Sequence, residues 1–100
     1  MLILSNTEKK MFDSTKYREF SAGDRAVLAV PANGETKADQ CAVYDNAEQC
    51  KFALGLLRAA MIADDKYFDF PHRDDLNEMM NQARQHKSKI TSRKVSYGGS

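Results

Sequence analysis

The segment Ala47–Ala63 runs for 17 residues with Gly55 as its only helix-weakening member. Apolar residues recur in it every three or four positions, which is the spacing of one face of an α-helix. A second apolar row, which begins at Phe52 and Leu56, lies beside the first, so this helix needs cover on more than one side. A sheet, another helix or a second subunit must therefore pack against it. The main stripe consists of Cys50, Leu54, Leu57 and Met61.

Two short patterns have the spacing of helix starts. Asp45 precedes Glu48 by three residues, as in a capping box, and predicts that the long helix is capped by Asp45. Ser5 and Glu8 have the same spacing and predict a short helix that ends near Phe12. The apolar residues that follow fit neither a helical nor a strand period, so we expect residues 7–19 to be irregular or weakly helical.

A β-hairpin is predicted in the middle of the chain. The runs Arg25–Val30 and Cys41–Tyr44 are apolar and β-branched enough to form strands. The connection between them contains Asn33-Gly34, a dipeptide that tolerates positive φ in a tight turn. Pro31 cannot donate to a strand ladder, so it must lie at an edge or at the end of its strand.

A second helix is predicted to start at Pro71, a residue favoured in the first helical turn. Acidic residues crowd its start and basic residues its end, the order that the helix dipole favours. The apolar residues of this helix recur at helical spacing: Leu76, Met79, Met80 and Ala83. We expect the helix to end near His86 and residues 88–100 to form a flexible basic tail. In the link before the helix, we expect Phe68 and Phe70 to be anchored in the core.

Together these elements predict one α+β domain over residues 1–87. One hundred residues are enough for a single hydrophobic core, though not for a large one. An antiparallel hairpin, with room for a third strand at Met1–Leu4, would pack on the two helices, and the basic tail would follow.

Charge is unevenly distributed along the chain. All 14 acidic residues lie at or before Glu78, together with 10 Lys and Arg, which gives that part a net charge of −4. The last 22 residues contain five bases and no acid. An acidic body with a basic end indicates which partners the chain could attract, because opposite charges attract. It does not indicate any catalytic activity.

Eight residues are candidate partner-binding residues. The five bases of the C-terminal end could neutralise phosphates or meet an acidic protein surface, and an aromatic residue among them could stack on a base. Two methionines add a soft apolar surface that fills the core or contacts a protein partner. The eight are Arg84, Lys87, Lys89, Arg93, Lys94, Tyr97, Met79 and Met80.

No catalytic, cofactor or metal site is predicted. The potential zinc ligands Cys41, Cys50, His72 and His86 lack the close pairing of a zinc module. An acidic cluster lacks the ligand order of a calcium loop, and helix capping, solvation or a basic partner explains it better. The cluster consists of Asp64, Asp65, Asp69, Asp74 and Asp75. Two unpaired cysteines favour a reducing, cytoplasmic setting, and no apolar run is long enough for a membrane span.

We therefore expect a non-enzymatic protein-binding regulator or inhibitor, of the kind that small phage or mobile-element proteins supply by docking on a larger machine. One alternative is a nucleic-acid accessory protein that works through the basic end. Another is a homodimeric structural protein held together through Phe52 and Leu56. An enzyme whose groups come from distant residues leaves no linear pattern, so that alternative stays open as well.

Overall fold

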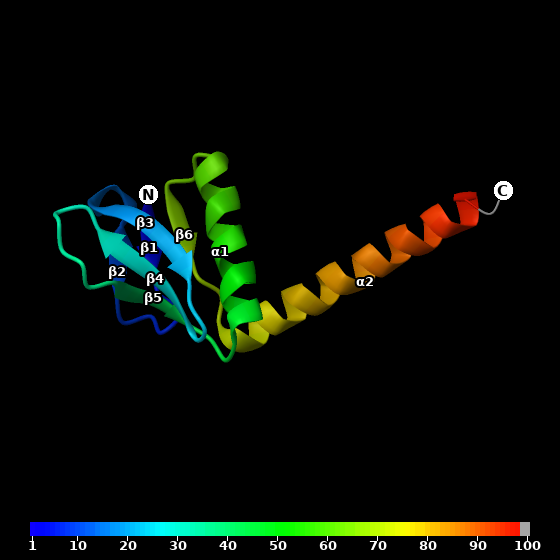
Figure 1. Ribbon diagram of the computed structural model, residues 1–100, viewed down its shortest axis with the longest axis horizontal. Helices are drawn as coiled ribbons and strands as arrows, with labels where there is room; N and C mark the ends of the chain where they lie inside the picture. Colours follow the sequence, from blue (N-terminus) through cyan, green and yellow to red (C-terminus); the bar gives the residue numbers. More distant parts are fainter. Residues whose placement is uncertain (99–100) are drawn as a thin grey trace.

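The computed structural model describes the backbone of residues 1–98 and the side chains of residues 1–85. Figure 1 shows the strands gathered in one body, with α1 lying along it and α2 running away from it. The α+β class predicted from the sequence is confirmed. In chain order the elements are β1 (Leu2–Leu4), β2 (Met11–Asp13), the 3-10 helix η1 (Ser14–Lys16), β3 (Tyr17–Ala22), β4 (Ala26–Pro31), β5 (Asp39–Val43), α1 (Ala47–Ile62), β6 (Tyr67–Asp69) and α2 (Arg73–Gly98).

The strands form two three-stranded sheets. One has the order β3-β4-β5 and is antiparallel, so the predicted hairpin is confirmed, with Pro31 as the last residue of β4. The other has the order β2-β1-β6, in which β1 pairs antiparallel with β2 and parallel with β6. The N-terminal strand thus exists, but it pairs outside the hairpin sheet.

The region after β1 differs from the prediction. The expected helix from Ser5 to Phe12 is absent from the described backbone, because Ser5 Oγ accepts from the Thr7 N–H (3.3 Å) and supports a turn between β1 and β2. Glu8 has a φ of 61°, which no helix continues. The range expected to be irregular forms β2, η1 and the first half of β3. A register shift between Tyr17 and Glu19 explains why its apolar spacing fits no period.

The cap of α1 lies one residue later than predicted. Asn46, not Asp45, is the N-cap, and its Oδ1 accepts from the Gln49 N–H (2.9 Å). Gln49 Oε1 in turn accepts from the N–H of Asp45, the residue before the cap (2.7 Å), so glutamine rather than Glu48 reaches back to the start of the helix. The capping logic holds, but both of its members are shifted by one position.

One core lies between α1, the sheets and the start of α2. Of the stripe predicted on α1, Cys50 and Leu57 are buried, Leu54 is half-buried and Met61 is exposed. The core residues are Ile3, Phe12, Val27, Ala29, Cys41, Ala42, Tyr44, Cys50, Ala53, Leu57, Phe70 and Leu76.

Helix α2 begins at Arg73, two residues after Pro71, and continues to Gly98, well past His86. The sequence between His86 and Gly98 contains no proline or glycine, so nothing in it stops the helix. The flexibility of residues 88–100 stays a prediction. The radius of gyration is 16.3 Å, against about 13 Å for a compact chain of this length, because α2 projects from the body (Figure 1).

Candidate functional site

The candidate site is a groove where α1, β6 and α2 meet. Two adjoining hollows, of about 370 and 400 Å³, share Pro71 and Met79 in their walls. We call their apolar lining the floor and the carboxylates around it the rim, and the whole is the acidic groove. The floor consists of Leu56, Ala59, Ala60, Phe68, Pro71 and Met79, and the rim of Asp65, Asp69, Asp75 and Glu78.

Each wall of the acidic groove is held by the core behind it. The Phe68 ring packs edge-on against the ring of buried Phe70, with centroids 5.0 Å apart. Tyr44 Oη donates to the Pro71 carbonyl (2.8 Å), which fixes the link between β6 and α2. Gln49 Nε2 donates to Asn77 Oδ1 (2.6 Å) and ties the first turns of α2 to α1. The groove is therefore a formed surface rather than a gap between loose segments.

The two predicted methionines have different roles. Met80 is half-buried and packs against the core, as core filling requires. Met79 keeps 42% of its surface exposed and lines both hollows. Met79 is thus the predicted partner-binding residue that the structure places in the candidate site.

The charged side chains in the rim of the acidic groove are all negative. Three of the rim carboxylates, Asp65, Asp69 and Asp75, belong to the acidic cluster recognised in the sequence. Asp65 precedes β6 and Asp69 is its last residue. Asp75 and Glu78 come from the first turns of α2. No lysine or arginine among the described side chains lines either hollow. An apolar floor inside a negative rim suits an apolar ligand that carries positive charge at its edges.

The predicted basic residues lie outside the acidic groove. Arg84 Nη2 donates to Glu48 Oε2 (3.3 Å) across the gap between α2 and α1, with both side chains mostly exposed. The backbone of α2 carries the other five positions away from the body (Figure 1). The side chains of Lys87, Lys89, Arg93, Lys94 and Tyr97 lie outside the described residues.

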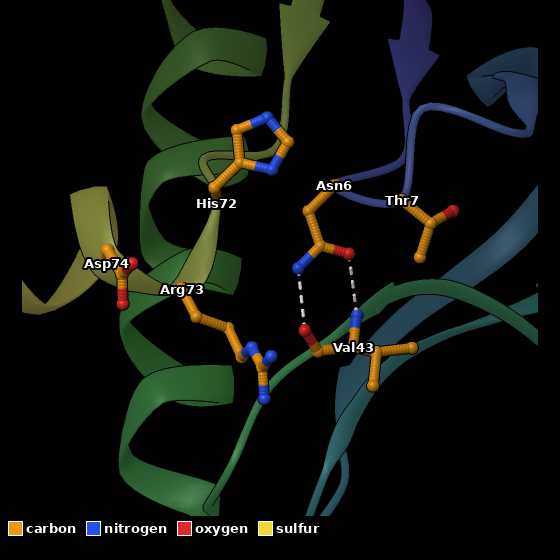
Figure 2. A pocket seen from close by; sticks show the side chains of 6 residues that line it. All are labelled: Asn6, Thr7, Val43, His72, Arg73 and Asp74. Carbon is orange, nitrogen blue, oxygen red and sulfur yellow. Dashed lines mark hydrogen bonds between the residues drawn. The ribbon is translucent and has the colours of Figure 1, made fainter.

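A second, polar cavity of about 560 Å³ lies beside the start of α2. Figure 2 shows the Asn6 amide making two hydrogen bonds to the backbone of Val43, while His72 and Arg73, at the start of α2, lie on the other side of the cavity. The cavity is lined by Asn6, Thr7, Val43, His72, Arg73 and Asp74.

The basic side chains around the polar cavity already have carboxylate partners. His72 Nε2 lies 3.1 Å from Glu8 Oε1, and Arg73 Nη1 donates to Asp45 Oδ1 at 2.8 Å. Asp74 adds a further negative charge to the lining. An anionic ligand would have to displace these carboxylates, so we assign the cavity no ligand.

Neither the cysteines nor a group of metal-ligating side chains forms a reactive site in the described part of the chain. Cys41 and Cys50 are free thiols buried in the core, and burial raises the pKa of Cys41 to about 12. Burial likewise raises the pKa of Cys50. Both thiols are therefore protonated and poorly nucleophilic at neutral pH. Among the described side chains, no three His, Cys, Asp or Glu residues come close enough to hold a metal ion.

Sequence reasoning missed how the groove is assembled. The α1 row containing Leu56 was recognised, and Phe68 packs against the core as predicted, but the place of Phe68 and Pro71 in the groove was not foreseen. The outer face of the β2-β1-β6 sheet was also not foreseen, where Leu2 is 41%, Met11 64% and Tyr67 71% exposed. Only the alternation of apolar residues in these short segments could have indicated it.

Comparison with protein-family models, with curated proteins and with solved structures finds no match to this chain. None of the helices, over the described residues, is both long and apolar enough to cross a bilayer.

Proposed function

We propose that this protein is a non-enzymatic protein-binding domain that docks on its partner through the acidic groove. The observation that carries this proposal is the pairing of an uncovered apolar floor with a rim of four carboxylates. Apolar surface that a small domain leaves in a formed hollow is more often an interaction site than an accident of folding. On the basis of the sequence alone, we further propose that the protein acts as a regulator or inhibitor in the cytoplasm.

The chemistry of the groove favours one class of ligand, an amphipathic segment with lysine or arginine beside its apolar residues. Met79 gives the floor an adaptable thioether surface, which suits ligand side chains of several shapes. The rim carboxylates would meet the cations of the segment, raise the association rate and reject acidic segments. A helix laid in a hydrophobic groove uses contacts of this kind.

The groove alone is too small to be a complete interface, since stable interfaces bury about 800 Å² on each partner. The groove would form the apolar centre of the interface, and the surrounding surfaces of α1 and α2 would form its periphery. Affinity should therefore depend strongly on Met79 and weakly on residues outside the groove.

The test uses a labelled amphipathic peptide with leucine on one helical face and lysine on the other, titrated with the full chain by fluorescence anisotropy. We expect Met79→Glu to weaken binding about tenfold or more, because it adds a buried charge to an already negative site. Met11→Glu is the matched control, since Met11 is exposed on the edge strand β2 and lines neither hollow, and it should change the affinity less than about twofold.

The same peptide with glutamate in place of lysine should not bind. Circular dichroism spectra must show that both variants keep the wild-type fold. Equal effects of the two substitutions, or equal binding of the acidic peptide, would overturn the proposal. A loss of binding with Met11→Glu alone would also overturn it, because it would move the interface to the outer sheet face.

A further inference from the structure

Helix α2 separates its own charges along its length. Its first turns carry Asp74, Asp75 and Glu78, and from Arg84 onward its charged residues are all basic. Two such helices placed side by side in opposite directions would set each acidic half against the basic half of the other. Antiparallel pairing is therefore electrostatically complementary to itself, and parallel pairing is not.

Apolar positions recur in the sequence of the same helix. Four of them are spaced by seven residues, the interval that returns to nearly the same face of a helix. The first is buried in the body of its own chain, and the last two fall in the part of α2 beyond Arg84, the helix whose backbone projects from the body (Figure 1). The four are Leu76, Ala83, Ile90 and Tyr97.

The projecting half of α2 needs another surface to stabilise it. Arg84 makes the most distal α2 hydrogen bond to the body among the side chains described through residue 85. Beyond it about four turns of helix continue to Gly98, and a solitary helix of that length is only marginally stable in water. Packing against another surface would supply the missing stabilisation.

We propose that the ligand of the acidic groove is a second copy of this chain, which rests on the proposed function of that groove. In a two-fold dimer, the basic half of each α2 lies along the acidic groove of the other copy. A register centred between Arg84 and Gln85 sets Ile90 opposite Met79 and Lys94 opposite Asp75. Such an interface is closed and isologous, so each contact occurs twice.

The Arg84 guanidinium is already paired within its own chain, 3.3 Å from the Glu48 carboxylate. Asp75 and Glu78 have no such cation in the described lining of the groove and are left for the partner.

The test is charge reversal at the predicted contact, read as molar mass by sedimentation velocity over a range of protein concentrations. We expect the wild-type chain to form dimers that dissociate as the salt concentration rises. Asp75→Lys alone and Lys94→Asp alone each place like charges opposite each other twice. Each variant should raise the dimer dissociation constant about tenfold or more.

Mixing the two single variants gives the decisive result. In the mixed dimer, the lysine introduced by Asp75→Lys in one copy faces the aspartate introduced by Lys94→Asp in the other. The second contact pairs the native Asp75 and Lys94. We expect the heterodimer to form with an affinity within about threefold of the wild type. A variant that failed to fold could not be rescued by mixing, so recovery also shows that both variants are folded.

A wild-type chain that stays monomeric up to about millimolar concentration, or a mixture that does not associate, overturns the inference. A dimer that neither single reversal weakens overturns it too. A monomer that still binds the leucine–lysine peptide in a Met79-dependent manner leaves the proposed function standing and rejects only self-pairing. A monomer that does not bind the peptide rejects both.

Discussion

Asn6 joins the two sheets through its side-chain amide. Its Nδ2 donates to the Val43 carbonyl (2.6 Å) and its Oδ1 accepts from the Val43 N–H (2.9 Å), so it pairs with the end of β5 as a neighbouring strand would (Figure 2). Asn6 is itself only 8% exposed. We predict that Asn6→Ala lowers the free energy of unfolding by about 1–3 kcal/mol, because two backbone groups lose their partner. Urea denaturation followed by far-ultraviolet circular dichroism measures the change.

Asn6→Asp is the matched control for this contact. The carboxylate keeps the acceptor for the Val43 N–H but sets an oxygen against the Val43 carbonyl, so the folded state favours the protonated form and raises the pKa of the new carboxyl. The stability that protonation restores is present below the unfolded pKa, about 4, and is lost as the pH rises through the folded value. The deficit relative to wild type should therefore shrink as the pH falls from 7 to 4. A deficit that does not change with pH would contradict the hydrogen-bond assignment.

At the scale of elements, the two helices and the hairpin were predictable because each carries its signal locally. Periodic apolar residues, caps and the Asn33-Gly34 turn lie within the elements that they specify. The strands β1, β2 and β6 have three residues each, which is less than two full periods of alternation. The parallel pairing of Ile3 with Phe68 joins segments far apart in the chain, and no local pattern indicates it.

The same limit explains what was found and missed in the candidate site. Met79 and the acidic cluster could be recognised because charge and residue type are visible in the sequence. The groove exists because β6 pairs with β1 and brings Phe68 and Asp69 beside α1. The sequence identified several of these residues, but because β6 was not predicted, it did not show that they lie together in one groove.

The end of α1 makes a separate prediction. The Asp64 N–H donates to the Met61 carbonyl (3.1 Å) and the Asp65 N–H to the Ala60 carbonyl (3.0 Å), which together form a Schellman motif. Asp64 occupies the left-handed position of this motif, with a φ of 59°. Glycine is favoured there, and a negative charge at a helix C-terminus opposes the helix dipole.

We predict that Asp64→Gly raises the free energy of unfolding by about 1 kcal/mol, because it removes both the left-handed strain and the unfavourable charge. Asp64→Asn removes the charge alone and should give a few tenths of that gain. Asp64→Val should destabilise the protein, since a β-branched residue resists positive φ. Thermal and urea unfolding of the three variants check the order Gly, Asn, wild type, Val, and any other order contradicts the assignment of the motif.

At the scale of the whole molecule, the acidic body and the basic half of α2 are joined by one continuous helix. The charge separation seen in the sequence thus becomes a separation in space, with the negative charge on the body and the positive charge on its projection (Figure 1). This arrangement favours self-pairing, because each molecule carries both members of the complementary pair. It disfavours a polyanionic partner, since the body repels what the projection attracts.

Duplex DNA therefore serves as the contrasting ligand. Five basic residues on five phosphates would give a slope of about −4.5 for the logarithm of the binding constant against that of the salt concentration. Raising the salt from about 50 to 200 mM would then weaken binding several hundred-fold. We expect any DNA binding to show a salt dependence up to this slope and to disappear when residues 88–100 are deleted. Binding of the leucine–lysine peptide should survive that deletion, because the acidic groove lies in the body. Anisotropy titrations of both ligands with both chains measure this, and DNA binding that persists in the deleted chain or ignores salt would contradict the assignment of roles to body and projection.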